Sequence, residues 1–266
     1  MSKLLVDEIG GNAAAATAIA SGKTISGTAA QFTITGGSSG DFLSTDGSGG
    51  LSFAAVAASG FNDVEAITAT GTYTVPTGIT KLLVMITGAG GGGAGGDNAT
   101  GKPGSGGLGA TTVIARVTVV PTDTISVALG AAGTAGAEGG VGGDGGDSTF
   151  THATGTGSGS MSTITAPGGK GGVFWAAPGT PAAGTVGVNN EGISILGGYG
   201  GGTTTTGEVQ AGSSFWGGGG LQAQTSVHAS IAGQAYGSGG GSGNNTTGYV
   251  VGAVGGPGVC FIMEFK

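Results

Sequence analysis

Nucleotide binding depends on glycines at fixed spacings beside a helix, and the sequence carries two fragments of such patterns. Gly104, Gly106 and Gly109 have the GxGxxG spacing of a dinucleotide-binding loop. They lead into the strand-like run TTVIARV, however, so no helix N-terminus follows to hold phosphates. The run Gly22-Lys23-Thr24 is similar to the lysine end of a phosphate-binding loop, but Thr17 stands where its first glycine should be. We expect neither fragment to bind a nucleotide.

Hydrolytic chemistry needs a nucleophile, a base and an orienting group that converge, and the sequence shows no such set. Gly36, Ser38 and Gly40 match GxSxG, yet turn residues flank them where a strand-to-helix elbow is required. The 14 acidic residues are scattered, so no carboxylate pair for glycoside hydrolysis can be proposed. The sequence therefore predicts no catalytic residues and a protein that is not an enzyme.

A metal site would need clustered acidic, cysteine or histidine ligands. Residues 139–144, GGVGGD, match one copy of a calcium-binding nonapeptide, but that motif works through stacked repeats. Asp144 and Asp147 are therefore interpreted as turn residues. The two histidines, His152 and His228, have no partner at a spacing typical of a metal site and are interpreted as surface-loop residues. We expect no metal and no cofactor.

Aromatic side chains are the stronger functional signal, because exposed rings provide large contact area at low entropic cost. Phe215 and Trp216 lie within SSFWGGGG and are interpreted as caps on the ends of glycine segments. For the aromatics beside longer polar loops, capping and receptor contact both remain open. The candidate receptor-contact residues are Phe174, Trp175, Asn189, Asn190 and Tyr199.

Glycine dominates the elements that must position these side chains. The chain has 67 glycines in 266 residues, and the tract GAGGGGAGG of residues 88–96 follows directly on the apolar run KLLVMIT. Such a composition is typical of disorder, but only 8% of the residues are charged and 38% are hydrophobic. Glycine can instead pack as left-handed helices with three residues per turn, which hydrogen-bond to one another. We expect such a packed polyglycine II region, organised around residues 88–96.

Charge and apolar content exclude several classes of partner. The formal net charge is −7 and no basic cluster occurs, which argues against nucleic-acid binding. The single cysteine, Cys260, lies in the apolar run VCFIMEF, so we expect it to be buried. No leader follows Met1, and no apolar run approaches the ~18 residues of a membrane span. We expect a soluble protein made in the cytoplasm.

The sequence predicts an all-β protein in three parts. Residues 1–60 form a thin, extended attachment segment with too few apolar residues for a core, so other chains are expected to order it, as in a homotrimer. Residues 61–70 are expected to be a linker, and residues 71–266 a β-sandwich-like framework with the packed glycine-rich region. The final run, GVCFIMEFK, is expected to close a sheet opened at residues 73–86.

The order of these segments resembles a known family. GTYTVPTGITKLLVMITGAGGGGAGG, then GGLGATTVIARVTVVPTDTISVALGAAGTAG and GGDGGDSTF, closed by GGPGVCFIMEFK, looks like the glycine-rich domain of bacteriophage tail fibres over residues 71–266. The resemblance implies a β framework with glycine helices at the surface of a virion. It also implies that loops contact a host receptor, either a glycan or an outer-membrane protein. The implied loops are residues 174–185, 188–195, 203–210 and 221–234.

The same resemblance implies that residues 1–60 attach the chain to other virion proteins. The expected function is therefore that of a structural tail fibre or tail-tip protein, located on the virion, that mediates attachment to the host cell. The alternative is a capsid decoration or head-fibre protein with a purely structural role. A depolymerase and a calcium-dependent matrix protein are weaker alternatives.

Overall fold

The computed structural model describes residues 41–45, 51–55, 60–97, 99–155, 161–174, 179–187, 189–202, 210–223, 229–244 and 251–266. The chain divides into two compact units, Met1–Ala57 and Ala58–Lys266. In the first unit, β1 (Asp41–Thr45) and β2 (Leu51–Ala55) form an antiparallel hairpin. The nucleotide-like and GxSxG fragments of residues 17–40 lie outside the described residues.

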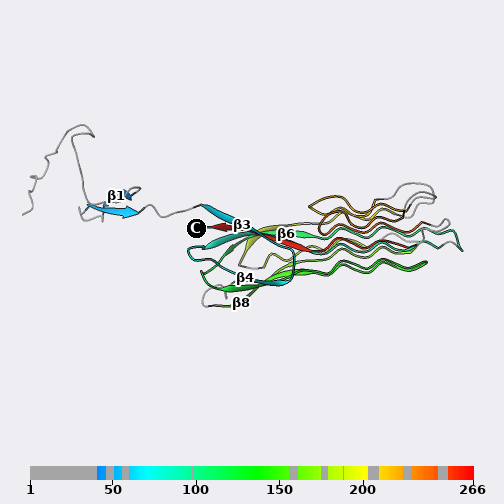
Figure 1. Ribbon diagram of the computed structural model, residues 1–266, viewed down its shortest axis with the longest axis horizontal. Helices are drawn as coiled ribbons and strands as arrows, with labels where there is room; N and C mark the ends of the chain where they lie inside the picture. Colours follow the sequence, from blue (N-terminus) through cyan, green and yellow to red (C-terminus); the bar gives the residue numbers. More distant parts are fainter. Residues whose placement is uncertain are drawn as a thin grey trace, which may run out of the picture. The chain divides into compact units, whose positions relative to one another are not determined.

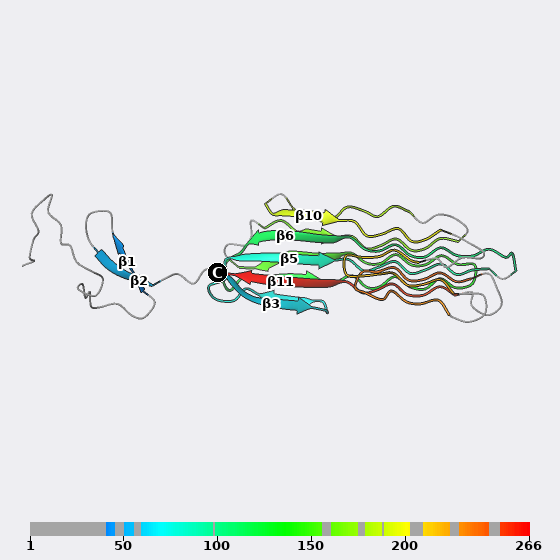
Figure 2. The same cartoon turned by 90° about the horizontal axis from the view of Figure 1, so that it is seen from above.

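The second unit joins two antiparallel sheets to a bundle of glycine-rich segments (Figures 1 and 2). One sheet has the order β10-β6-β5-β11-β3, with β3 (Phe61–Ile67), β5 (Lys81–Thr87), β6 (Thr112–Thr118), β10 (Glu191–Ile195) and β11 (Val259–Phe265). The other has the order β4-β7-β8-β9, with β4 (Gly71–Thr74), β7 (Thr124–Ala128), β8 (Ser148–Thr154) and β9 (Ile164–Ala166). The all-β prediction is confirmed.

Alternating residues of the two sheets face each other and form one apolar core. On β5, Leu82, Val84 and Ile86 are fully buried, whereas the residues between them are half-buried on the opposite face. Phe150 of β8 and Cys260 of β11 belong to the same buried cluster, as expected for the cysteine. The side-chain period of two along a strand explains why such short runs are enough to build the framework.

A buried carboxylate ties both sheets together inside the framework. Glu264 on β11 is 5% exposed. Its Oε1 accepts a hydrogen bond of 2.8 Å from the Tyr73 hydroxyl on β4, and its Oε2 accepts one of 2.7 Å from Asn62 Nδ2 on β3. Burial and the hydrogen bond to Glu264 raise the pKa of Tyr73 above its ordinary value, so the phenol remains a donor. The buried acid therefore has a partner at each oxygen.

Three sequence-based expectations for the strands need correction. Most of the expected linker, residues 61–70, is strand β3, an edge strand that pairs only with β11 and is largely exposed, so it shows no continuous apolar run. The implied loop of residues 188–195 is mostly strand β10, the other edge of the same sheet. The C-terminal strand β11 pairs with β5 as expected, but Tyr73 belongs to the opposite sheet. In the described part of the chain, no helix is long and apolar enough to span a membrane.

Beyond the strand ends, residues 88–96 continue β5 as a fully buried extended segment, here called the central rod. None of its glycines has a positive φ. Its N–H groups donate in steps of three residues, at 2.8–3.2 Å between N and O, which is the repeat of a polyglycine II helix. The acceptors lie on three neighbouring segments: residues 104–111 for Gly88, Gly91 and Ala94, residues 140–146 for Ala89, Gly92 and Gly95, and residues 252–256 for Gly90 and Gly93.

The carbonyl groups of the central rod bond to three further glycine segments, or rods. Residues 130–139 donate to Gly90, Gly93 and Gly96, residues 168–172 to Ala89 and Gly92, and residues 237–243 to Gly91 and Ala94. The central rod thus has six neighbours, three that accept from it and three that donate to it. Rods that run side by side can satisfy their backbone groups in this way only if no side chain separates them. This packing confirms the expected polyglycine II region and its centre.

The sequence of a rod at the surface of the bundle reflects how many other rods surround it. In residues 130–136 every third residue, Gly130, Gly133 and Gly136, is buried, and the exposed sides carry alanine and threonine. In residues 139–147, GGVGGDGGD, two glycines in each turn alternate with the exposed Val141, Asp144 and Asp147. A side chain is therefore accommodated only where a rod lacks a neighbour.

Asp144 and Asp147 correct a further expectation, because they lie in a rod and not in a turn. The Asp144 carboxylate accepts hydrogen bonds from the Gly171 N–H at 2.8 Å and from Lys170 Nζ at 2.7 Å. Asp147 accepts from the Gly168 N–H at 2.9 Å, one turn away on the same neighbouring rod. The two carboxylates therefore supply the acceptors that a further rod would have supplied at this edge of the bundle.

Acid is expected to weaken this edge. Partial burial alone raises the pKa of the Asp144 carboxyl, but the hydrogen bonds from Lys170 and Gly171 and the Lys170 charge leave it below its ordinary value. A depressed carboxyl pKa stabilises the fold above the unfolded-state pKa of about 3.9, and this contribution is lost as the pH falls through the folded-state pKa. Both side chains of the pair are about half exposed, so the contribution is below about 1 kcal/mol.

Thermal melting of Asp144→Asn at neutral pH and near pH 3 checks this expectation. The variant should melt slightly below the wild-type protein at neutral pH, and the difference should shrink in acid. An equal difference at both pH values would contradict the role assigned to the Asp144 charge.

Candidate functional site

The rods end together at the edge of the bundle farthest from the sheets, here called the tip (Figure 2). At the tip, the central rod passes into a turn in which Asp97 and Lys102 exchange backbone hydrogen bonds of 2.7 and 3.1 Å. The Asp97 carboxylate accepts from the N–H groups of Ala99 and Thr100 and from the Thr100 hydroxyl. The Thr100 hydroxyl is the main reason that the pKa of Asp97 lies below its ordinary value. This turn is therefore fixed by its own side chains.

A second described turn, at Glu138 and Gly139, lies against the first. Gly139 has a φ of 64°, which favours glycine, and its N–H donates to Gly96 at the end of the central rod. Four further connections, residues 175–178, 203–209, 224–228 and 245–250, lie outside the described residues. By the order of the chain they follow rods or extended segments that end at Phe174, Gly202, Ala223 and Asn244.

Close to the tip, the rods are joined to one another by hydrogen bonds. The Gly243 N–H donates to the carbonyl of Ala94 at 2.8 Å, and the Gly104 N–H donates to Gly243 at 3.2 Å. Asn244 is 5% exposed, and its Nδ2 donates to the Ala223 carbonyl at 3.0 Å. The tip is thus an end face supported by directly bonded backbones, which is the arrangement that holds variable segments on a rigid scaffold.

The structure describes four of the five sequence-predicted receptor-contact residues and does not bring these four together. Phe174 is half-buried and its backbone pairs with Gly104 near the tip. Tyr199 is 64% exposed and follows β10 along the side of the bundle. Asn189 and Asn190 precede β10, at the end of the sheet away from the rods, and Asn190 Nδ2 donates to the carbonyls of Ser162 and Val186. Trp175 lies outside the described residues.

The turn at Phe215 and Trp216 supports the interpretation of Trp216 as a cap. Trp216 is half-buried where β5 passes into the central rod, and its Nε1 donates to the Thr87 hydroxyl at 2.8 Å. Its ring packs on Phe261 of β11, with ring centroids 4.7 Å apart. Phe215 meets the Trp216 ring edge-on and is 45% exposed. The turn therefore fastens the rods on either side of it to the five-stranded sheet.

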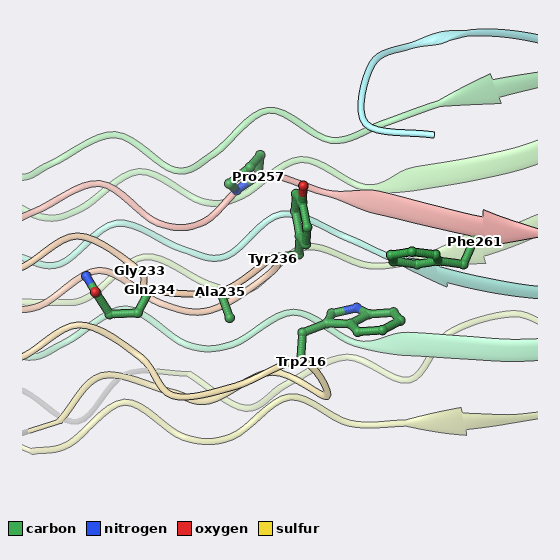
Figure 3. A pocket seen from close by; sticks show the side chains of 7 residues that line it. All are labelled: Trp216, Gly233, Gln234, Ala235, Tyr236, Pro257 and Phe261. Carbon is green, nitrogen blue, oxygen red and sulfur yellow. The ribbon is translucent and has the colours of Figure 1, made fainter. Parts of the chain in front are cut away.

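Beside Trp216 lies an open groove of about 390 Å³ (Figure 3). Its lining residues are Trp216, Gly233, Gln234, Ala235, Tyr236, Pro257 and Phe261, and none of them is charged. Three aromatic rings and a proline ring offer flat apolar surfaces, with the Gln234 amide at the margin. Because no carboxylate, imidazole or amine lines the groove, its chemistry favours the binding of an apolar surface over catalysis.

Titratable groups elsewhere in the described residues form no obvious reaction centre. His152 lies on strand β8 and not in a surface loop, and its Nε2 is 3.5 Å from a carboxylate oxygen of the buried Asp123. His228 lies outside the described residues. Within the part of the chain that is described, no group of three or more His, Cys, Asp or Glu side chains is placed to hold a metal ion.

Sequence reasoning identified Trp216 as an aromatic residue beside a glycine tract but missed the groove that it shares with Tyr236, Pro257 and Phe261. Phe261 belongs to an apolar strand and gives no signal of exposure. The one pattern that points to Pro257 is the three-residue spacing of Val251, Val254 and Pro257, which places all three on the exposed side of one rod.

Comparison with known families gives one match. The sequence model of a glycine-rich domain family matches residues 65–263. No curated protein matches the chain. The match begins within β3 and ends within β11, so it spans both sheets and the whole rod bundle.

Proposed function

Because this chain belongs to the glycine-rich domain family, we propose that it is a structural virion protein of the tail-fibre or tail-tip type, without catalytic activity. In this proposal, the segments at the tip contact a receptor on the host cell surface, either a glycan or an outer-membrane protein. Residues 1–60 attach the chain to other virion proteins and take part in a homotrimer.

The observation that supports this proposal best is the way the chain traverses the rod bundle. The chain leaves a sheet, or a turn that lies beside a sheet, then runs to the tip and returns. The described turn at residues 97–102 is fixed at the end of the central rod. The other connections emerge from segments that end at the same edge. Repeated returns through a bonded scaffold gather short segments of different sequence on one surface, as a binding surface requires.

The tip also offers the kind of side chains that recognise polar surfaces. Asp97, Thr100, Lys102 and Glu138 lie in its two described turns, and all four are exposed or half-buried. Together these groups supply hydrogen-bond donors and acceptors of both charge types, which suits a glycan or the polar loops of a membrane protein.

Replacement of tip segments by glycine–serine segments of equal length tests the proposal. We expect full-length protein with residues 203–209 or 245–250 replaced to lose most of its binding to host cells, measured by flow cytometry of labelled protein, with little change in melting temperature. Ala131→Ser, on the exposed side of a rod just after β7 and close to the sheets, is the control and should bind as the wild-type protein does.

Competition with intact virus particles distinguishes the adhesin from the capsid alternative. Added wild-type protein is expected to reduce adsorption of particles to host cells. A wild-type protein that neither binds those cells nor reduces adsorption would contradict the adhesin role and favour a purely structural role on the capsid.

A further inference from the structure

The outer face of the five-stranded sheet is apolar across its width. The pairing register places Phe261 of β11 opposite Met85 of β5, and Met85 opposite Ile114 of β6. These residues alternate with the buried core positions, so they point away from the other sheet. This surface is called the apolar sheet face, and its apolar members are Phe61, Val64, Leu83, Met85, Ile114, Ile193, Phe261, Met263 and Phe265.

At its rod end, this face is in contact with the turn at Phe215 and Trp216, because Trp216 packs on Phe261. Figure 2 shows β10, β6, β5, β11 and β3 side by side in one layer. Ile193 is 59% exposed, and Phe61 and Val64 are exposed to a similar degree. At the end opposite the rods, Leu83, Phe265 and the basic residues Lys81, Arg116 and Lys266 line a hollow of about 340 Å³.

The outer face of the other sheet provides an internal comparison. There the outward positions of β7 and β8 are mainly hydroxylated, including Thr124, Ser126, Thr149 and Thr151. The Thr124 and Thr154 hydroxyls bond to each other, and Thr151 donates to the Thr163 hydroxyl. An antiparallel sheet that faces water typically carries polar residues on that side. Only the five-stranded sheet departs from this pattern, so its outer face is suited to burial.

The size of the apolar sheet face matches an interface between two protein chains. Five strands spaced about 4.8 Å apart, with up to seven residues at about 3.4 Å each, give a planar area of about 24 Å by 24 Å, or about 570 Å². Stable interfaces bury at least about 600 Å² on each partner, and side-chain relief raises the accessible area above the planar value.

The charges on this face fit a second copy of the chain better than a strongly charged partner. The chain as a whole carries a net charge of −7, which opposes self-association elsewhere on its surface. On this face, however, Arg116 pairs with Glu191 at 2.6 Å, and Lys81 and Lys266 lie at one end. The basic residues at this end of one copy can therefore lie against the negatively charged surface of another copy, while the apolar residues of the two faces pack together.

We propose that the apolar sheet face is an interface through which two copies of this chain pack against each other, sheet on sheet. A face that meets its own copy forms a self-complementary contact around a two-fold axis, and two packed sheets lie about 10 Å apart with interdigitated side chains. This contact goes beyond the proposed attachment role. It does not depend on what the tip binds, and it is separate from any contact made by residues 1–60.

Charge substitutions at residues that are already exposed test the interface without disturbing the core. Sedimentation equilibrium of the full-length wild-type protein over a dilution series should show reversible self-association. Ile193→Glu and Val64→Glu, near opposite edges of the sheet, should each weaken it by about tenfold or more, because each buries an unpaired charge in the contact. Val141→Glu is the matched control, since Val141 is 63% exposed on a rod, and it should leave association unchanged.

Two outcomes of this experiment would overturn the proposal. A wild-type protein that stays monomeric throughout the series shows that the face does not bind a second copy. Self-association that is equally strong in Ile193→Glu, Val64→Glu and Val141→Glu shows that copies meet elsewhere, for example through residues 1–57. Neither outcome bears on host-cell binding, which is measured separately.

Thiol cross-linking locates the contact directly. The single native cysteine, Cys260, is fully buried, and burial raises its pKa to about 12, so it is unreactive in the folded protein at neutral pH. Leu83→Cys places a thiol on the central strand of the face. A short bismaleimide should join Leu83→Cys chains into dimers and should join Val141→Cys chains much less. Equal cross-linking of both variants, or of neither, would refute the interface.

Discussion

Valine in place of Gly91 or Gly92 is expected to unfold the glycine-rich domain. A Cβ added at Gly91 would lie 2.1 Å from the carbonyl oxygen of Lys170, and one at Gly92 would lie 1.9 Å from that of Thr134. Both contacts are with backbone of neighbouring rods, so no side-chain rotation relieves them. Separating the rods would break their mutual hydrogen bonds and leave buried amides without partners. We expect a loss of at least about 4 kcal/mol in the free energy of unfolding.

Thermal melting followed by circular dichroism checks this result, together with the yield of soluble protein. Gly202→Ala is the control, because a Cβ there would meet nothing within 4 Å and Gly202 has no positive φ. This variant should melt within a degree or two of the wild-type protein, since exposed sites without such contacts change stability by at most about 0.5 kcal/mol. Unchanged melting of Gly91→Val would show that the rods are not held in a close-packed lattice.

Alanine in place of Trp216 is expected to have the second-largest effect. The substitution removes the ring packed on Phe261 and the hydrogen bond from Nε1 to Thr87. The Thr87 hydroxyl also bonds to Thr112 at 2.8 Å, so the change reaches β6. Because Trp216 is half-buried, the cost should fall near the low end of the range for aromatic truncation, about 2–4 kcal/mol.

Two further variants separate the contributions at this turn. Trp216→Phe keeps an aromatic ring but loses the donor, and should cost about 1 kcal/mol. Phe215→Ala removes the exposed neighbour and should cost less than Trp216→Ala. Chemical denaturation followed by circular dichroism measures all three variants. A larger loss in Phe215→Ala than in Trp216→Ala would contradict the assignment of Trp216 as the residue that fastens the turn.

Much of the framework could be predicted because its central strands are continuous apolar runs bounded by glycine or proline. Residues 81–87 and 259–265 are clear examples. The edge strands β3 and β10 could not be identified in this way, because each has one neighbour in its sheet and an exposed surface. Their backbone hydrogen bonds define them as strands, and such bonds have no signature in side-chain hydrophobicity.

The rod bundle was predictable as a type of packing but not as an arrangement. Every glycine N–H can bond to every glycine carbonyl, so composition alone does not say which rods are neighbours. A usable signal does exist in the number of glycines per three-residue turn, because one glycine in three marks an outer rod and an almost complete tract marks the central one. This local period is hidden because the chain as a whole has no strict repeat.

The candidate binding residues were harder to place for a related reason. Phe174, Asn190 and Tyr199 have a similar sequence context, since each is an aromatic or polar residue close to glycine. They nevertheless lie at different places along the second unit. Position along the rod axis is set by how many turns each rod makes before it reverses. That length is fixed by contacts between rods and cannot be read from the residues around one aromatic side chain.

The direction of the hydrogen bonds in the central rod has a mechanical consequence. The bonds run between rods, across the axis that joins the sheets to the tip, and β5 continues directly into the central rod. A pull applied at the tip along this axis therefore loads all bonds between neighbouring rods in shear at the same time, and none can break alone in sequence. Such a pull is thus transmitted through glycine backbone into the strands of the framework, and drawing one rod out of the bundle must rupture many hydrogen bonds at once.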